Sequence, residues 1–353
     1  MVVMDAAEGP SDRARLAPEW TGRYDGHGPE HARWHQVAQP ASSWAAAHGS
    51  EHIGLLGFCS DEGVRRNGGR AGARSGPAAL RRALAPLAAH GDLAQQVTGL
   101  VDHGDAVTGG EDLETGQADA ARLITTALDA RGCRLAIVLG GGHETAWASY
   151  RGLMVSQQMA GPAGARPRWG VLNLDAHFDL RQEDRPTSGT PFWQMAEAER
   201  AAERELRYAV IGIAEPSNTP VLFDTARELG VRWLTDVDCW RGGEAGITDF
   251  VADFAHGLDV LYLTIDLDVL PASVAPGVSA PAAFGVGTHL VAAAVRAAAG
   301  TGKLALLDVV ELNPALDIDS RTARTAARLI DEAVRAHVPP GRTADTSRDL
   351  PAQ

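Results

Sequence analysis

Acidic residues and histidines follow two apolar segments of the sequence at intervals of two residues. The segment VLNLDAHFD carries Asp175, His177 and Asp179 at its end, and VLYLTIDLD ends with Asp266 and Asp268. Alternate residues of an extended chain point to the same side, so each group can present its side chains together. Carboxylates and imidazoles grouped in this way are typical ligands of divalent metal ions.

Two further apolar segments end with residues of the same kinds. His143 follows the glycines at 140–142, which allow the backbone to turn tightly, and Glu311 follows ALLDVV. Ligands bind outside the carboxyl ends of strands in open parallel sheets, so we expect these four segment ends to converge. Packing or capping would explain His143 alone, and a turn would explain one Asp-x-Asp. The four ends together predict a metal site.

The predicted metal site contains four aspartates and two histidines. Burying four carboxylates together is very costly unless cations offset their charge, and two divalent ions carry the matching charge. Oxygen ligands with some imidazole and no thiolate suit Mn²⁺ better than structural Zn²⁺. Two metal ions roughly 3.5–4 Å apart can hold a bridging water and lower its pKa toward neutrality. The sequence therefore predicts a binuclear site that generates a nucleophilic hydroxide.

Motifs of several other reaction classes are missing from the sequence. The glycines at 140–142 do not continue as G-x-G-x-x-G, and no second histidine follows His143-Glu144 at the spacing of a zincin. Lys303 is the only lysine, so the chain has no phosphate-binding G-x-x-x-x-G-K-[ST] loop. The sequence therefore offers no dinucleotide-binding, zincin or phosphate-loop motif of these patterns.

The composition indicates a globular protein of a reducing compartment. The chain has 353 residues and a formal net charge of −13, which argues against nucleic acid as a partner. The start of the chain does not look like a signal peptide, and no run of about 18 apolar residues could span a membrane. Cys59, Cys133 and Cys239 are odd in number and far apart, which predicts a cytoplasmic location.

Short apolar runs alternate with helix-like stretches along most of the chain. This alternation predicts a mostly parallel sheet, and the continuous apolar character of the runs predicts that both faces are covered. We therefore expect a three-layer α/β/α sandwich in one domain, 19–338, with flexible tails at 1–18 and 339–353. The predicted strands are 52–59, 134–140, 168–175, 207–213, 231–235, 260–268 and 303–310, and examples of the predicted helices are 77–90, 112–131, 197–206 and 289–300.

Several motifs resemble those of the ureohydrolases, the family of arginase, agmatinase and formimidoylglutamase. They are GGGHE, DAHFD, TIDLDVLPASVAPGVSAP and ELNP, and the resemblance covers roughly residues 50–335. GGGHETAWASYRGL, DAHFDLR followed by SGTPF, and the segments 20–37 and 61–77 are most similar to the formimidoylglutamase branch. The resemblance implies the arginase-type sandwich, a binuclear manganese site and a homo-oligomer.

The resemblance also implies a role for each residue of the predicted site. It assigns two sets of ligands that share Asp175 and Asp266 as bridges: His143, Asp175, Asp179 and Asp266 for one Mn²⁺, and Asp175, His177, Asp266 and Asp268 for the other. Glu311 corresponds to the glutamate that holds the nitrogen end of the substrate. Asp179 corresponds to the aspartate that passes a proton to the leaving amine.

Two positions differ from the arginase and agmatinase pattern. Those relatives carry a histidine, a proposed proton shuttle, before the glycine of the loop after DAHxD, whereas this chain has Ser188 before Gly189. Arg181 occupies a position where arginase has an amide, and Arg can bind a carboxylate bidentately. We therefore expect Arg181, Ser188 and Gly189 to contact a small amidine that bears carboxylates. A second carboxylate contact is expected from Arg65, Arg66, Asn67 and Arg70, unless this Arg-rich loop is simply solvated.

The reaction predicted on this basis is hydrolysis of N-formimidoyl-L-glutamate to L-glutamate and formamide, a step of histidine degradation, by attack of the metal-bridging hydroxide. One alternative is a guanidino-acid ureohydrolase that releases urea; Arg181 would also serve that substrate, but Ser188 argues against it. An alternative of another class is a metal-binding regulatory protein without turnover, because a fold does not by itself imply a function.

Overall fold

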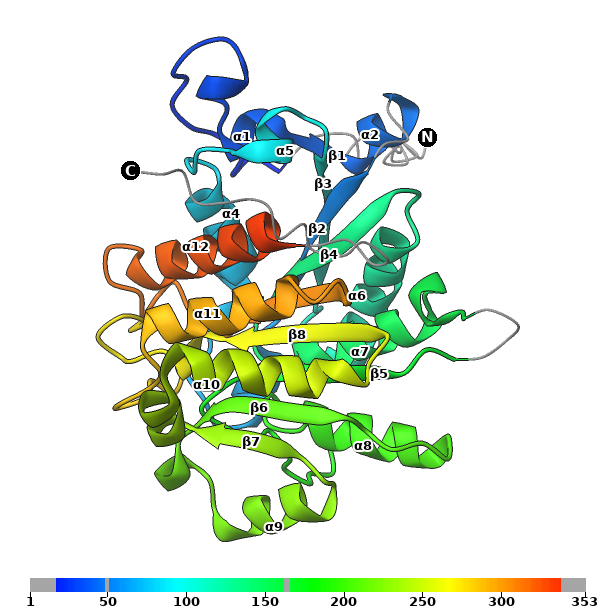
Figure 1. The fold of residues 1–353 in the computed structure, drawn as a ribbon, viewed down its shortest axis with the longest axis vertical. Coiled ribbons are helices and arrows are strands. Elements are labelled where there is room, and N and C mark those ends of the chain that lie inside the picture. The colour runs from blue at the N-terminus through cyan, green and yellow to red at the C-terminus, as the bar shows by residue number, and fades with distance from the viewer. Residues whose placement is uncertain (1–16, 48–50, 162–165, 338–353) are drawn as a thin grey trace, which may run out of the picture.

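The computed structural model describes residues 17–47, 51–161 and 166–337 (Figure 1). The predicted tails, 1–18 and 339–353, therefore fall outside the described residues except for positions 17 and 18. Within the described residues, no helix is both long enough and apolar enough to cross a membrane.

One parallel sheet forms the centre of the described part. Its nine strands are β1 (Ala38–Pro40), β2 (His52–Cys59), β3 (Gly99–Val107), β4 (Cys133–Leu139), β5 (Trp169–Leu174), β6 (Tyr208–Ile213), β7 (Arg232–Thr235), β8 (Val260–Asp266) and β9 (Leu304–Val310). They lie in the order β1-β3-β2-β4-β9-β8-β5-β6-β7, and each pairing is parallel. The seven predicted strands correspond to β2 and β4 to β9.

Helices cover both faces of this sheet (Figure 1), so the predicted three-layer α/β/α sandwich is confirmed. One layer consists of α4 (Gly76–Leu84), α10 (Asp236–His256), α11 (Thr288–Ala299) and α12 (Arg321–Ala336). The other contains α6 (Leu113–Leu128), α7 (Thr145–Val155), α8 (Pro191–Ala201) and α9 (Pro220–Glu228). Shorter helices are α1 (Trp34–Val37), α2 (Ala41–Ala47), α3 (Glu62–Arg66) and α5 (Gly91–Ala94).

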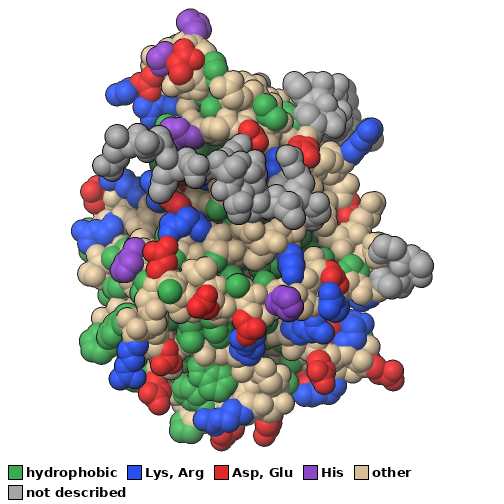
Figure 2. Space-filling model, viewed as in Figure 1, with side chains coloured by type: hydrophobic (Ala, Val, Ile, Leu, Met, Phe, Trp, Pro, Cys, Tyr) green, Lys and Arg blue, Asp and Glu red, His purple; other side chains and the backbone are tan. Residues whose placement is uncertain are grey.

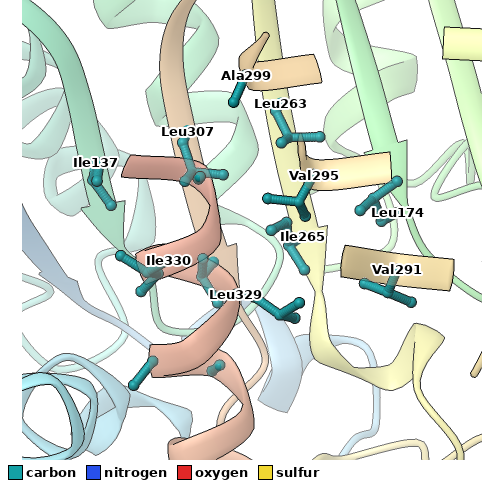
Figure 3. Packing of buried hydrophobic residues seen from close by; sticks show 14 of the residues in the cluster. Ile137, Leu174, Leu263, Ile265, Val291, Val295, Ala299, Leu307, Leu329 and Ile330 are labelled. Carbon is teal, nitrogen blue, oxygen red and sulfur yellow. The ribbon is translucent and has the colours of Figure 1, made fainter. Parts of the chain in front are cut away.

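The middle strands are fixed by apolar packing against the helices. Figure 3 shows Leu263 and Ile265 of β8 and Leu307 of β9 beside Val295 of α11 and Ile330 of α12, and all five side chains are buried. Burying one such side chain contributes roughly 1.5–3 kcal/mol. The carboxyl ends of these strands are therefore held firmly in place.

Two strands at one edge of the sheet were not predicted. β1 is only three residues long, and β3 carries the polar stretch Asp102-His103-Gly104-Asp105, which does not resemble a buried strand. The structure accommodates Asp102 because the buried Arg81 guanidinium donates two hydrogen bonds to its carboxylate, at 2.8 and 2.9 Å. The residue that neutralises Asp102 is distant in the sequence, so the sequence of the strand alone does not reveal it.

The predicted helix 197–206 has the wrong bounds. α8 begins at Pro191, whose missing N–H is tolerated at a helix start, and ends at Ala201. The chain then turns through Glu203, at φ 56°, while Arg204 pairs with Glu199 at 2.7 Å. The helix-favouring composition of 202–206 is overridden by this turn.

Both signs of charge are interspersed on the face that carries α10 to α12 (Figure 2). Among the residues coloured there, basic side chains do not gather into a continuous patch. Such a patch is the usual electrostatic footprint of nucleic-acid binding.

Candidate metal centre

Four residues from three strands in the middle of the sheet converge at its carboxyl edge. His143 follows β4, Asp175 and Asp179 follow β5, and Asp266 is the last residue of β8. The Nδ1 atom of His143 lies 3.2, 2.9 and 3.1 Å from carboxylate oxygens of Asp175, Asp179 and Asp266, respectively. The four side chains are close enough together to hold one metal ion.

A second group of ligands shares Asp175 with the first. Nδ1 of His177 lies 3.1 Å from Oδ2 of Asp268 and 3.4 Å from Oδ1 of Asp175, and these three side chains could hold another ion. Asp266 belongs to the first group alone, and its Oδ1 accepts a hydrogen bond from the backbone N–H of Asp268 at 2.8 Å. Bridging by Asp175 agrees with this geometry, whereas bridging by Asp266 stays a prediction.

The ring of His143 indicates that the first group fits a cation. Its Nδ1 is buried and, among the described residues, has no hydrogen bond of suitable geometry. Three carboxylate oxygens nevertheless lie within 3.2 Å of it. One N–H proton can serve only one of these oxygens well, whereas a metal ion among them can bind them all together with the ring nitrogen.

The carboxylates of this centre perturb one another strongly. Burial and the charges of Asp268 and Asp175 raise the pKa of Asp266 well above its ordinary value, and burial also raises the pKa values of Asp179 and Asp268. Burial acts in the same direction on Asp175, but hydrogen bonds with His143 and His177 hold its pKa below the usual range. The raised pKa values favour protonated carboxyl groups in a metal-free centre, and bound cations would replace such protons.

Glu311 follows β9 at the same edge of the sheet. Its Oε1 accepts a hydrogen bond from the backbone N–H of His143 at 2.8 Å, and burial together with the charge of Glu144 raises the pKa of Glu311 to about 8. Glu311 and Asp179 adopt φ values of 68° and 49°, a left-handed conformation uncommon outside glycine. Such strain clusters at functional sites, which supports a role for both residues.

A cavity of about 340 Å³ opens in front of the two ligand groups. Glu311 lines it together with His143, His177, Asp179, Asp266 and Asp268. The predicted substrate contacts Asn67, Arg181 and Ser188 also line it. The structure therefore brings most of the predicted site residues around one space.

Arg181 is an exposed, cationic residue in the lining of this cavity. Among the described residues, no hydrogen-bond or ion-pair partner is found for its guanidinium group. The backbone N–H of Arg181 donates to the carbonyl of Gly189 at 3.0 Å, and a Cβ at position 189 would lie 2.9 Å from Cδ of Arg181. Gly189 thus makes room for the Arg181 side chain rather than contacting the cavity itself.

Asn67 and Ser188 form a polar pair beside Arg181. Nδ2 of Asn67 donates a hydrogen bond to Oγ of Ser188 at 3.2 Å. A Cβ placed at position 189 would lie 3.2 Å from this Nδ2 atom and 2.9 Å from Cδ of Arg181, so the Asn67 amide and the Arg181 side chain are close together. An anion bound to Arg181 would therefore also meet an amide and a hydroxyl.

The structure does not bring Arg65 into the cavity, contrary to the expectation of a substrate contact. Its guanidinium pairs with Glu62 at 2.7 Å and with Glu111 at 3.1 Å. Arg66 is likewise engaged by Glu62 and Glu114, at 2.9 and 2.8 Å. Nearby acidic side chains, which the local sequence does not identify as partners, hold both arginines away from the cavity.

Arg70 does line the cavity, but its guanidinium is largely occupied. Its Nε donates to the carbonyl of Ser279, and its Nη2 donates to the carbonyls of Val278 and Ser279, at 2.8–3.0 Å. Arg181 is therefore the better placed of the predicted arginines for binding a substrate carboxylate.

Asn218 is a cavity residue that the sequence reasoning missed. Its amide donates to the carbonyls of Ala176 and Ala214 at 2.9 Å, and its Oδ1 accepts from the backbone N–H of Phe178 at 3.1 Å. These contacts brace the segment that carries Asp175, His177 and Asp179. Asn218 could have been found in the sequence, because it is a polar residue that follows the apolar strand β6, as the other candidate residues follow their strands.

Comparison with known proteins identifies the class to which this fold and site belong. Residues 51–335 match the Arginase family, and the chain is a member of that family.

The relatives to which this chain is similar include two formimidoylglutamases. The Nocardia farcinica protein is 50% identical over 92% of this chain and 98% of its own length. The Rhodococcus jostii protein is 48% identical over 91% of this chain and 96% of its own length. Both alignments extend over nearly the whole of each protein, so the resemblance of the motifs to the formimidoylglutamase branch is confirmed.

Solved structures agree with this fold. The crystal structure of formimidoylglutamase from Bacillus subtilis has a TM-score of 0.74 and 22% identity, and the match covers 91% of this chain and 95% of that one. Trypanosoma cruzi formiminoglutamase with Mn²⁺ has a TM-score of 0.68 and 27% identity, covering 81% of this chain and 93% of that one.

Proposed function

We propose that the chain hydrolyses N-formimidoyl-L-glutamate to L-glutamate and formamide. The observation that carries this proposal is the Arg181 guanidinium, which has no partner among the described residues and lines the same cavity as the proposed metal ligands. This arrangement suits a small substrate with a reactive amidine at one end and a carboxylate at the other. The extensive identity with formimidoylglutamases supports the same substrate.

Two Mn²⁺ ions are proposed as the cofactor. Bound ions would offset the buried carboxylate charge and supply a water of lowered pKa as nucleophile. One ion would be held by His143, Asp175, Asp179 and Asp266, and the other by Asp175, His177 and Asp268. The Mn²⁺ in the Trypanosoma cruzi structure supports the choice of metal.

Arg181, Asn67 and Ser188 would bind a carboxylate of the substrate. The guanidinium offers a bidentate contact, and the Asn67 amide and Ser188 hydroxyl lie beside it. This contact would fix the orientation of the substrate in the cavity. The formimidoyl group would then meet Glu311 and Asp179, which line the same cavity.

Glu311 and Asp179 would act directly on the reacting group. Because Oε1 of Glu311 is held by the His143 N–H, the carboxylate has a fixed orientation for hydrogen bonding the cationic formimidoyl nitrogen. Asp179 lines the cavity, where its carboxylate can take up the proton that the attacking water releases. Asp179 would deliver this proton to the departing glutamate nitrogen, so that an amine rather than an amide anion leaves.

A product assay tests this function. Purified protein loaded with Mn²⁺ would be incubated separately with formimidoylglutamate, arginine, agmatine and 4-guanidinobutyrate. We expect formamide and glutamate from the first compound and no urea from the others. Urea released from a guanidino acid, with no formamide from formimidoylglutamate, would instead establish the guanidino-acid alternative. No turnover of any compound by Mn²⁺-loaded protein would favour the regulatory alternative.

We also propose that the protein acts in the cytoplasm, in histidine degradation, as a homo-oligomer. The three cysteines are free in the structure, which suits a reducing compartment. Size-exclusion chromatography with light scattering would test the assembly, and a monomer at micromolar concentration would contradict it.

A further inference from the structure

Asn173 is a polar residue inside the apolar strand β5, two positions before the proposed ligand Asp175. Its side chain is completely buried. Alternate residues of a strand share a face, and Nδ2 of Asn173 donates a hydrogen bond to Oδ2 of Asp175 at 2.9 Å. The other oxygen of Asp175, Oδ1, accepts a hydrogen bond from the backbone N–H of His177 at 2.6 Å. Each oxygen of this carboxylate therefore has a donor that fixes its direction.

Tyr208 of β6 connects Asn173 to the backbone of a second ligand. Nδ2 of Asn173 also donates to the Tyr208 hydroxyl at 3.1 Å, and this hydroxyl donates to the carbonyl of Phe178 at 2.9 Å. Phe178 directly precedes Asp179, the ligand in the left-handed conformation. The buried Tyr208 ring is stacked on that of Phe192, with ring centroids 4.3 Å apart, so the hydroxyl is held in place.

Counting protons fixes the orientation of the Asn173 amide. An amide nitrogen has two protons to donate, and a tyrosine hydroxyl has one. Since Tyr208 donates its proton to Phe178, its oxygen is left to accept from Asn173. Oδ1 of Asn173 has no hydrogen-bond partner among the described residues, although it is buried. Such an acceptor costs stability, so packing of the core does not explain an amide at this position.

Asn173 and Tyr208 supply hydrogen bonds without supplying positive charge. In the part of the chain that the structure describes, the four proposed aspartate ligands form ion pairs only with His143 and His177, and none with Lys or Arg. A cationic partner would offset the negative charge that attracts metal ions. A neutral donor orients the carboxylate of Asp175 and leaves its charge available.

We propose that Asn173 and Tyr208 are positioning residues that orient Asp175, the aspartate common to both ligand groups, for binding two cations. The proposal rests on the proposed metal centre, since it explains how the shared ligand of that centre is held. Ligating carboxylates typically have hydrogen-bond partners of this kind. Neither residue is among the described residues that line the cavity, so both act through the ligand segment and not on the substrate.

Mn²⁺ binding by two variants tests the proposal, with free Mn²⁺ measured from its electron paramagnetic resonance signal during titration. Asn173→Leu removes both donors at similar size. It should weaken binding at both Mn²⁺ positions about 10–100-fold, because Asp175 belongs to both groups. Tyr208→Phe removes only the hydroxyl that holds the Phe178 carbonyl. It should weaken binding about tenfold, mainly at the position served by Asp179.

Two matched variants control for the loss of a buried hydrogen-bonding group. Asn313 is a buried amide whose Nδ2 also donates two hydrogen bonds, to the carbonyls of Arg70 and Ala71. Tyr150 is a buried tyrosine whose hydroxyl donates to Glu199 at 2.7 Å. These bonds do not reach the ligand segment, so Asn313→Leu and Tyr150→Phe should keep the Mn²⁺ affinity within twofold of wild type.

Melting temperatures of the metal-free variants separate positioning from a purely structural role. A lower melting temperature of Asn173→Leu, with Mn²⁺ affinity within twofold of wild type, would overturn the proposal. Losses of affinity in the controls as large as those in Asn173→Leu and Tyr208→Phe would also overturn it. If Asn173→Leu does not fold, Tyr208→Phe with Tyr150→Phe as its control still decides. Wild-type protein that binds no Mn²⁺ would refute the metal centre itself, a failure distinct from that of the positioning residues.

Discussion

Nη1 of Arg66 donates a hydrogen bond across 3.1 Å to the backbone carbonyl of Pro186, a residue 120 positions further along the chain. The Arg66 side chain is only 7% exposed and also pairs with Glu62 and with Glu114 of α6. Asn67 is the next residue, and Ser188 lies two residues after Pro186. Arg66 therefore fastens together the two segments that carry this polar pair of the cavity.

Replacing Arg66 should loosen the substrate contacts without removing any of them. We expect Arg66→Gln to raise KM for formimidoylglutamate and lower kcat/KM about tenfold or more, since small displacements of positioning groups are costly. Steady-state kinetics would show this, while Mn²⁺ affinity stays constant. Arg65→Gln is a matched control, because Arg65 pairs with the same Glu62 but is 51% exposed. Equal kinetic effects from both variants would contradict this role.

Arg181 should determine affinity for the substrate carboxylate. Arg181→Gln removes a charge-assisted contact of roughly 1.5–3 kcal/mol, so kcat/KM should fall about 10–150-fold, mostly through KM. Arg181→Lys should be intermediate because an ammonium cannot bind bidentately. The exposed Arg185 in the same segment provides the control variant Arg185→Gln. Unchanged KM in Arg181→Gln would show that the carboxylate is bound elsewhere.

Asp268 should be needed for the second metal ion and for turnover together. Asp268→Asn keeps the side-chain size but removes a charge from the group with Asp175 and His177. Loss of a ligand should weaken the binding of that ion by more than the roughly 10–100-fold expected for loss of a residue that only hydrogen-bonds a ligand. Metal analysis beside the formamide assay checks both effects, with Asp259→Asn, an exposed ion-pair residue, as control. Full activity with one ion per chain would refute the two-metal mechanism.

The stability of metal-free protein should fall as pH rises toward alkaline values. Burial and the charge of Glu144 raise the pKa of Glu311 from its ordinary 4.5 to about 8, so the folded chain holds a proton that the unfolded chain releases. This stabilisation is complete below about pH 4.5 and is lost as pH rises through about 8. Asp179, Asp266 and Asp268, whose pKa values are also raised, act in the same direction.

Melting temperatures recorded in a chelator from about pH 5 to pH 9 would measure this dependence. Glu311→Gln cannot release the proton, so its melting temperature should vary less steeply with pH than that of wild type. Added Mn²⁺ should stabilise wild type most at high pH, where it no longer competes with bound protons. Identical pH profiles for wild type and Glu311→Gln would show that Glu311 is not the group responsible.

The convergence of the proposed metal ligands was predictable because its signal is local. Asp175 and His177 directly follow an apolar strand, and the same relation holds for Asp266 on β8. Parallel strands bring such ends to one edge regardless of strand order, so the order itself was not needed. The middle strands were recognisable for a similar reason, since burial on both faces leaves a continuous apolar run.

The remaining parts depend on contacts between distant segments. Arg65 lies in α3 and Asn67 directly follows that helix, yet only Asn67 reaches the cavity, because Glu62 and Glu111 engage Arg65. β3 was missed because its Asp102 is compensated by Arg81 of another element. Ion-pair partners of this kind are chosen by the tertiary structure, and no periodicity of the sequence reveals them.

The strands β4, β9, β8 and β5 lie in the middle of the sheet. Catalysis and substrate selection would therefore depend on two different kinds of scaffold. The residues that would break the bond sit at the ends of rigid, fully packed strands. The residues that would choose the substrate, Asn67, Arg181 and Ser188, sit on connecting segments that tolerate change. Substitutions in those segments could redirect the same hydrolytic machinery to another amidine or guanidine, which makes them the natural starting point for engineering a new specificity.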